Sequence, residues 1–114
     1  MNKDTLFLLK AGFYDGDQGP YVCAASTKVE GFLALYPHVA MAIDVRRLPF
    51  RRPRAELVAL LGDAYQDCPV LVLGDAAQPR VAASANGNGR RFIAETNAIL
   101  SYLGTAYRAR RRTK

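Results

Sequence analysis

The sequence is poor in the residues that build metal sites and disulfide frameworks. Its 114 residues include two cysteines, one histidine and no tryptophan. Two cysteines cannot form the disulfide framework of a small secreted domain, and one histidine cannot anchor a multi-histidine metal site. We therefore expect no metal and no tightly bound cofactor, and we expect the chain to work in the cytoplasm.

Long apolar runs are also missing. The uninterrupted apolar runs, such as Leu6–Leu9, are only a few residues long, whereas a membrane-spanning helix needs about 20 apolar residues. Asp4 and Lys10 interrupt the start of the chain, which is not the pattern of a signal peptide. We expect no membrane partner, and a single domain over residues 1–107 followed by a basic tail over residues 108–114.

Positive charge is concentrated in two groups. The net charge is +6, but five positive charges lie in the last seven residues and five more lie within residues 46–54. Without these ten charges the rest of the chain would carry −4. Such groups suit nucleic acid, an acidic partner or a phosphate. The basic tail has no aromatic residue among its arginines to stack bases, so we expect a solvated tail rather than a nucleic-acid site.

The first half of the chain predicts a strand, a loop, a helix and a second strand. Residues 5–10 form a short apolar run of the kind found in buried strands. Glycines, aspartates and a proline over residues 13–20 predict a loop. Apolar side chains at i, i+3, i+4 and i+7 then predict a helix that begins near Cys23 and stops at Pro37. Loose alternation predicts a second strand over residues 41–48.

The second half of the chain predicts a helix, a central strand and a hairpin. Pro53 suits the first turn of a helix that Gly62 closes. Residues 70–73 are apolar and mostly branched, which indicates a buried central strand. A glycine- and asparagine-rich insertion follows, and the Asn-Gly pair at residues 88–89 predicts a hairpin turn into a strand over residues 91–93.

A final helical stripe, with Thr96 as its N-cap, completes the order β-α-β-α-β-β-α. The β-α-β opening requires a parallel pair of strands with a right-handed crossover, and the later hairpin adds two antiparallel strands. We therefore expect an α/β fold in which about three helices flank a four-stranded mixed sheet.

Three stretches of the sequence resemble the thioredoxin superfamily. Residues 21–26, Tyr-Val-Cys-Ala-Ala-Ser, are similar to the Cys-x-x-Cys or Cys-x-x-Ser motif of glutaredoxins and thiol-type glutathione transferases. Residues 68–73, Cys-Pro-Val-Leu-Val-Leu, resemble the superfamily's cis-proline and central strand. Residues 91–103 are similar to the Glu-Ser-x-Ala-Ile-x-x-Tyr-Leu signature of glutathione transferase N-terminal domains. The chain also resembles short, uncharacterised bacterial proteins with the Leu-Phe-Leu-Leu-Lys opening and the Gly-Arg-Arg-Phe-Ile segment.

The resemblance implies a thioredoxin-like fold with a site built on Cys23. This residue would lie at a helix N-terminus, where free amide donors and the helix dipole favour the reactive thiolate. Ser26 takes the position of the resolving cysteine, and its hydroxyl could donate a hydrogen bond to the thiolate. The implied chemistry is therefore monothiol, through a mixed disulfide with glutathione or a protein thiol. The alternative is that Cys23 is a small apolar residue in a vestigial site.

The same resemblance implies that the bond before Pro69 is cis and that Val70 offers its backbone to an extended thiol peptide. It also implies that Cys68, as the residue before the proline, faces Cys23. The alternative is that Cys68 packs as a small buried residue, as free cysteines commonly do.

The resemblance further implies that Glu95 and Thr96 bind the γ-glutamyl end of glutathione. Tyr21, in the loop before Cys23, either lines the same site or covers the core. A hydroxyl with helix-terminal amides suits a carboxylate, and a glutamate suits an ammonium group. Helix capping would explain both residues equally well. The all-helical second domain of glutathione transferases is not expected, because the chain ends at Lys114, so a conjugating activity would need a partner subunit.

Two functions of different classes follow. The first is a glutathione-dependent thiol–disulfide oxidoreductase, or a transferase-like protein, that acts through Cys23. The second is a non-catalytic binding or adaptor domain with a degenerate thiol site and basic patches that bind a partner. A homodimer is compatible with either.

Overall fold

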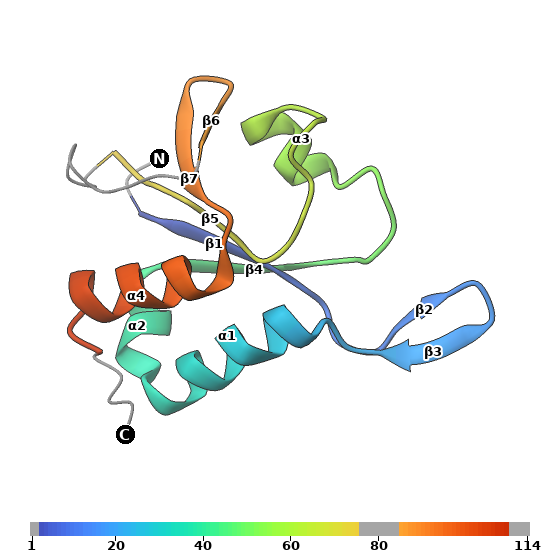
Figure 1. The fold of residues 1–114 in the computed structure, drawn as a ribbon, viewed down its shortest axis with the longest axis horizontal. Coiled ribbons are helices and arrows are strands. Elements are labelled where there is room, and N and C mark those ends of the chain that lie inside the picture. Colours follow the sequence, from blue (N-terminus) through green and yellow to red (C-terminus); the bar gives the residue numbers. More distant parts are fainter. Residues whose placement is uncertain (1–2, 76–84, 110–114) are drawn as a thin grey trace.

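A mixed β-sheet forms the middle of the molecule in the computed structural model, which describes residues 3–75 and 85–109 (Figure 1). Its strands, in order across the sheet, are β4 (Asp44–Leu48), β1 (Thr5–Leu9), β5 (Val70–Val72), β7 (Arg90–Ile93) and β6 (Ala85–Gly87). β1 is parallel to β4 and antiparallel to β5, and β7 is antiparallel to both β5 and β6. The four expected strands are thus present in one mixed sheet, and β6 adds a fifth at its edge.

Helices cover both faces of this sheet (Figure 1). One face carries α1 (Ala24–Leu35), α2 (Pro37–Ala42) and α4 (Thr96–Ala106), and the other carries α3 (Ala55–Leu61). None of the helices within residues 3–75 and 85–109 is long and apolar enough to cross a membrane.

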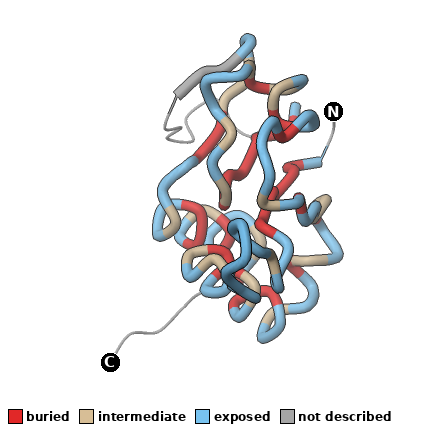
Figure 2. The backbone as a smooth tube through the Cα atoms, turned by 90° about the vertical axis from the view of Figure 1, so that its right-hand side faces the viewer, coloured by how far each residue is buried: buried red, intermediate tan, exposed pale blue. Residues whose placement is uncertain are grey.

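Each face of the sheet buries its own apolar cluster, and Figure 2 shows the buried residues along the strands and on parts of the helices. The larger cluster, under α1, α2 and α4, comprises Leu6, Leu8, Val29, Phe32, Leu33, Val39, Ile43, Leu71, Leu73, Ile93, Ile99, Leu100, Leu103 and Ala109. The smaller cluster, under α3, comprises Phe7, Leu48, Leu57, Leu61, Val70, Val72 and Phe92. Because successive strand residues point to opposite faces, β1 contributes to both clusters. This double burial explains why its residues form an unbroken apolar run.

Residues 13–20, predicted as a loop, instead form most of a two-stranded hairpin. β2 (Phe13–Asp15) pairs antiparallel with β3 (Gln18–Tyr21), and the hairpin projects from the body of the molecule (Figure 1). Gly16 makes the turn at φ +64°, a left-handed conformation that glycine adopts without steric cost. Most of the hairpin is exposed, so it lacks the apolar alternation by which half-buried strands are predicted.

The strand predicted over residues 41–48 begins only at Asp44, because Pro37 starts an additional helix. α1 ends at Leu35, close to the predicted stop, and Pro37 is the first residue of α2. Proline suits the first helical position because the missing N–H has no partner there and its φ is already helical. Pro37 therefore ends one helix and also opens the next.

Two predicted helix starts are wrong by one or two residues. Pro53 is not in the first turn of α3, because Arg54 is the N-cap. Thr96 is not an N-cap either, because the Glu95 carboxylate accepts the N–H of Ala98 at 2.7 Å and Thr96 is already helical. Threonine is a more common N-cap than glutamate. Residue preferences alone therefore predict Thr96 as the N-cap, although Glu95 takes that position.

Other local predictions are confirmed. Gly62, at φ +88°, ends α3. Asn88 and Gly89, at φ 51° and 76°, form the turn between β6 and β7, as expected for an Asn-Gly hairpin. The Cys68–Pro69 bond is cis. Most of the predicted insertion, residues 76–84, lies outside the described part of the chain.

The carboxylate of Asp4 joins the start of β1 to the end of β5 and to the last helix. It is buried and accepts the N–H of Gly74 at 2.7 Å and the hydroxyls of Tyr102 and Tyr107 at 2.5 and 2.7 Å. Burial, together with the bond to Asp4, raises the pKa of both tyrosines well above the ordinary range. Both phenols therefore remain protonated donors at any ordinary pH.

Replacing this carboxylate should destabilise the fold. In Asp4→Asn one carboxylate oxygen becomes an NH2 group, which cannot accept a hydrogen bond. At least one of the three groups that donate to Asp4 then loses its acceptor, and the remaining oxygen is no longer charged. We expect unfolding in urea to require about 2–4 kcal/mol less free energy. The exposed Asp63→Asn is the control for the same chemical change, and it should shift the midpoint very little. Equal midpoints for the two variants would contradict the role of Asp4.

The packed body extends beyond residue 107, where the sequence predicts a tail to begin. Ala109 is buried in the larger cluster, and its N–H donates to the carbonyl of Gly104 at 2.9 Å. Ala109 therefore packs against the body two residues beyond the expected boundary at Tyr107. Residues 110–114 lie outside the described part.

Two truncated chains measure this contribution. A chain ending at Tyr107 should be less stable than one ending at Ala109 by about 1–2 kcal/mol, because it loses a buried methyl group and one hydrogen bond. Both chains end in a carboxylate and lack residues 110–114, and a chain ending at Ala109 with Arg108→Gln controls for the charge of Arg108. Thermal and urea unfolding provide the measurement, and indistinguishable stabilities would contradict a stabilising role for the packing of Ala109.

Candidate functional site

Most of the residues that the sequence singles out lie toward one end of the sheet. β1 and β4 end there, and β5 begins there because it runs antiparallel to β1. α1 and α4 also begin at this end (Figure 1), and Lys28 Nζ of α1 donates to Asn97 Oδ1 of α4 at 2.8 Å. The fold therefore brings Cys23 toward the start of β5 and the start of α4.

Cys23 is the N-cap of α1. Its Sγ accepts the backbone N–H of Ser26 at 3.4 Å and lies 4.0 Å from the carbonyl oxygen of Cys68. The side chain is half-buried. An N-cap sulfur that receives a helix amide is in the position where a thiolate gains most from the helix terminus. The predicted location of Cys23 at the helix N-terminus is confirmed.

The Ser26 hydroxyl has a different partner from the one expected. Ser26 is buried, and its Oγ accepts the backbone N–H of Leu9 at 3.1 Å. The backbone N–H of Ser26, rather than its hydroxyl, bonds to Cys23. The reason is that Leu9 is the last residue of β1 and its N–H is buried, so it needs an acceptor. No local pattern in the sequence could reveal this contact across 17 positions.

Cys68 is a second free thiol next to the first. Burial raises the pKa of its thiol to about 11, and the nearby charge of Arg54 opposes this effect only in part. At neutral pH Cys68 is therefore a neutral thiol. Pro69 and Val70 follow it, both buried, and Val70 pairs with Phe7 inside the sheet.

The three remaining predicted site residues lie on two elements. Glu95 is exposed and uses one carboxylate oxygen to cap α4, and Thr96 is half-buried in the first turn. Tyr21 is exposed on β3, its hydroxyl donates to Gln18 Oε1 at 3.1 Å, and its ring lies 5.9 Å from that of Phe13. Both contacts of Tyr21 lie within the hairpin.

The structure also contains a groove that the sequence does not predict. It has a volume of about 690 Å³ and lies between the β2–β3 hairpin and the segment that precedes α3. The rings of Phe13 and Phe50 stack in parallel at 4.4 Å. The groove is lined by Phe13, Tyr14, Asp15, Gly16, Phe50, Arg51, Arg52 and Arg54. The sequence shows the arginines as a cluster of positive charge. It does not show that they lie opposite the β2–β3 hairpin.

The arginine-rich group at residues 46–54 is largely engaged within the molecule. Arg46 bonds Asp44 and Glu56, and both nitrogens of the Arg47 fork bond Glu30 at 2.8 Å. The hydrogen bond from Arg47 lowers the pKa of Glu30. These two arginines therefore supply exposed ion pairs on β4 rather than a continuous basic patch.

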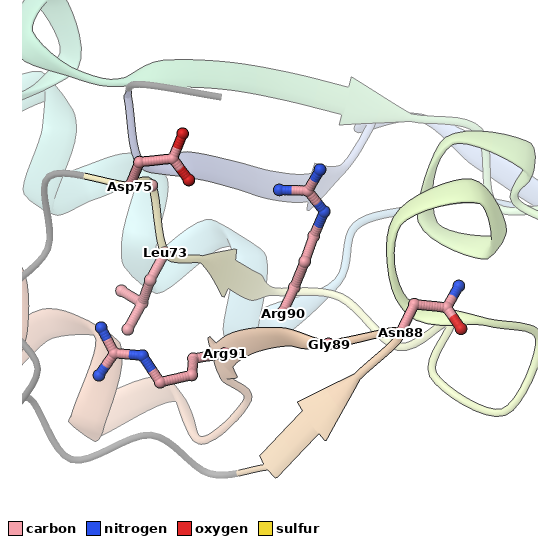
Figure 3. Close-up of a pocket in the computed structure, with 7 residues that line it drawn as sticks. Leu73, Asp75, Asn88, Gly89, Arg90 and Arg91 are labelled. Atoms are coloured by element: carbon pink, nitrogen blue, oxygen red, sulfur yellow. The ribbon is translucent and has the colours of Figure 1, made fainter.

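A second, smaller pocket lies at the opposite end of β5 (Figure 3). Its volume is about 390 Å³, and its lining includes Gly74, Asp75, Arg90 and Arg91. Figure 3 shows Arg90 and Arg91 pointing away from one another. Within the described part of the chain, no group of three or more potential metal ligands gathers here or elsewhere.

Fold and site together define a mixed α/β protein with a half-buried thiol at a helix N-terminus. The chain belongs to the family described as "Protein of unknown function (DUF3088)", which matches residues 3–111. No curated protein and no solved structure matches the chain.

The raised pKa of Cys68 predicts an unusual pH dependence of its alkylation. In Cys23→Ser, labelling of Cys68 by iodoacetamide should rise about tenfold per pH unit from pH 7 to 10, because the thiolate fraction rises in that proportion below the pKa. A plateau near pH 9, where an exposed thiol is already ionised, would contradict the burial of Cys68.

The same pKa predicts a loss of stability in alkali. Between about pH 9 and pH 11 the unfolded chain releases the Cys68 proton and the folded chain keeps it, so the free energy of unfolding falls as the pH rises. Cys68→Ala should weaken this fall, and circular dichroism at each pH measures it.

Proposed function

We propose that the protein is a thioredoxin-like monothiol protein that exchanges disulfides through Cys23. The observation that carries the proposal is the bond from the Ser26 amide to the N-cap sulfur of Cys23 at 3.4 Å. An amide N–H that points at sulfur is the contact a thiolate would use at a helix N-terminus, and the thiolate is the form that attacks disulfides.

The topology supports the thioredoxin-like assignment. Leaving aside the edge strand β6, the order is β4-β1-β5-β7, with one parallel pair followed by two antiparallel pairings. α1 and α4 cover one face and α3 the other. This is the arrangement that the resemblance to the superfamily implies. The β2–β3 hairpin is an addition between the first strand and the first helix.

The proposed reaction uses one cysteine and an external disulfide. The Cys23 thiolate attacks one sulfur of oxidised glutathione, the glutathione S–S bond breaks, and a Cys23–glutathione disulfide forms. The other glutathione leaves as a thiolate and takes a proton from water. Position 26 holds serine, so a second thiol, reduced glutathione or a protein thiol, must attack the mixed disulfide and restore Cys23.

The surroundings of Cys23 offer a binding surface for a thiol peptide. In this proposal Tyr21, Pro69 and Val70 contact the extended backbone of glutathione, and Glu95 and Thr96 contact its γ-glutamyl end. The bond to Ala98 engages one carboxylate oxygen of Glu95, which leaves the other for an ammonium group. Free thiols at positions 23 and 68 fit a reducing compartment such as the cytoplasm.

A binding or adaptor domain is the second candidate. The groove beside the hairpin favours it, because this groove is lined by three arginines and three aromatic residues and contains neither cysteine. In that case Cys23 would act as a helix cap only.

Mass spectrometry after treatment with oxidised glutathione tests the redox proposal. We expect one glutathione adduct per chain, located on Cys23, and reversal by reduced glutathione. Cys68→Ser should keep the adduct and Cys23→Ser should lose it. Iodoacetamide at neutral pH should label Cys23 faster than Cys68. Absence of the adduct together with slow labelling of Cys23 would reject thiol exchange and favour the binding domain.

A further inference from the structure

The groove beside the hairpin contains a buried arginine without an acidic partner. Arg54 is 6% exposed, and its guanidinium donates to the carbonyls of Phe50 and Gln66, both at 2.6 Å. Its Nε has no hydrogen-bond partner, and no carboxylate forms an ion pair with it among residues 3–75 and 85–109. Buried charges are normally paired, because an unpaired one loses its hydration without compensation.

The neighbours of Arg54 do not supply the missing negative charge. Cys68 is close enough to interact electrostatically, but its thiol is neutral at ordinary pH because burial raises its pKa. Asp67 is bound by Arg52 at 2.6 Å. Asp15 is the single acid among the residues that line the groove, against three arginines. Because Asp67 balances Arg52, the lining keeps two uncompensated arginines, Arg51 and Arg54, against one acid, Asp15. This net positive charge is screened least by water at the buried guanidinium of Arg54.

The aromatic walls of the groove indicate what kind of group an anionic ligand would carry beside its negative charge. Phe13 and Phe50 form a parallel stack, and Tyr14 stands beside them, 58% exposed. Flat apolar surface next to guanidinium groups suits a ligand with a planar apolar body and an anionic end. The volume of about 690 Å³ lies in the range typical of small-molecule sites.

We propose that this groove binds a small aromatic anion, whose carboxylate or phosphate group is held by Arg51 and Arg54 and whose ring lies against the Phe13–Phe50 stack. Arg51 supplies direct contact, since it is exposed and lines the groove. Arg54 is buried and its guanidinium is held by two carbonyl groups, so it supplies a positive charge that does not move. The proposal does not depend on the chemistry of Cys23, because the groove is lined by neither cysteine.

Nuclear magnetic resonance titrations of the full chain test this site. The probes are benzoate, phenyl phosphate and the neutral benzamide. We expect benzoate or phenyl phosphate to shift the amide signals of residues 13–16 and 50–54, and the stronger of the two identifies the preferred anionic group. Benzamide should bind at least about tenfold more weakly, a difference of 1.4 kcal/mol. Equal binding of benzamide, or no shifts by about 10 mM probe, would overturn the proposal.

Charge variants locate the site. Arg51→Gln should weaken binding about tenfold or more, and Asp15→Asn should strengthen it by removing the competing carboxylate. Lys3→Gln, an identical loss of one charge at the other end of β1, should leave binding unchanged. The Arg54→Gln variant should not bind the probe if the variant folds. If that variant does not fold, the result for Arg51→Gln decides whether the groove is the binding site. Equal weakening by Lys3→Gln and Arg51→Gln would show attraction to the net charge only and would reject the groove.

Discussion

The hydrogen bonds to the buried carboxylate of Asp4 hold the sheet and the last helix in one arrangement. The backbone carbonyl of the same residue accepts the N–H of Asp44 at 2.9 Å, so this position links β1 to β4, to the end of β5 and to α4. The opposite ends of these strands also lie close together, because β1 pairs with both β4 and β5. That opposite end is where Cys23, the start of β5 and the start of α4 meet. The contacts of Asp4 therefore hold together, at one end of the sheet, the same strands whose other ends lie near the thiol.

The sequence predicts the elements whose burial is visible as a pattern. β1 and β5 are apolar runs, and α1 and α4 show helical stripes, because each lies in or against the core. The β2–β3 hairpin is missed because its residues are mostly exposed, and its link to the rest of the molecule, the stack of Phe13 on Phe50, joins residues 37 positions apart. The position of Cys23 follows from local signals. The Ser26 bond to Leu9 and the burial of Arg54 do not, because both depend on how distant segments pack.

The arginines of residues 46–54 show why a cluster in the sequence is not a patch on the surface. Alternation along β4 and the turn before α3 send neighbouring side chains to different partners. Arg46 and Arg47 form exposed ion pairs, which contribute little to stability individually. Arg54 points inward and binds carbonyl groups. The single cluster in the sequence thus separates into exposed ion pairs on β4, the exposed Arg51 that lines the groove, and the buried Arg54.

The bond between Ser26 and Leu9 also constrains how the protein could evolve. A dithiol site would require cysteine at position 26, but that side chain is committed to the last amide of β1, and sulfur is a weak hydrogen-bond acceptor. A resolving cysteine at this position would therefore weaken the end of β1. The hydroxyl at position 26 therefore has a structural role that does not depend on the chemistry of Cys23.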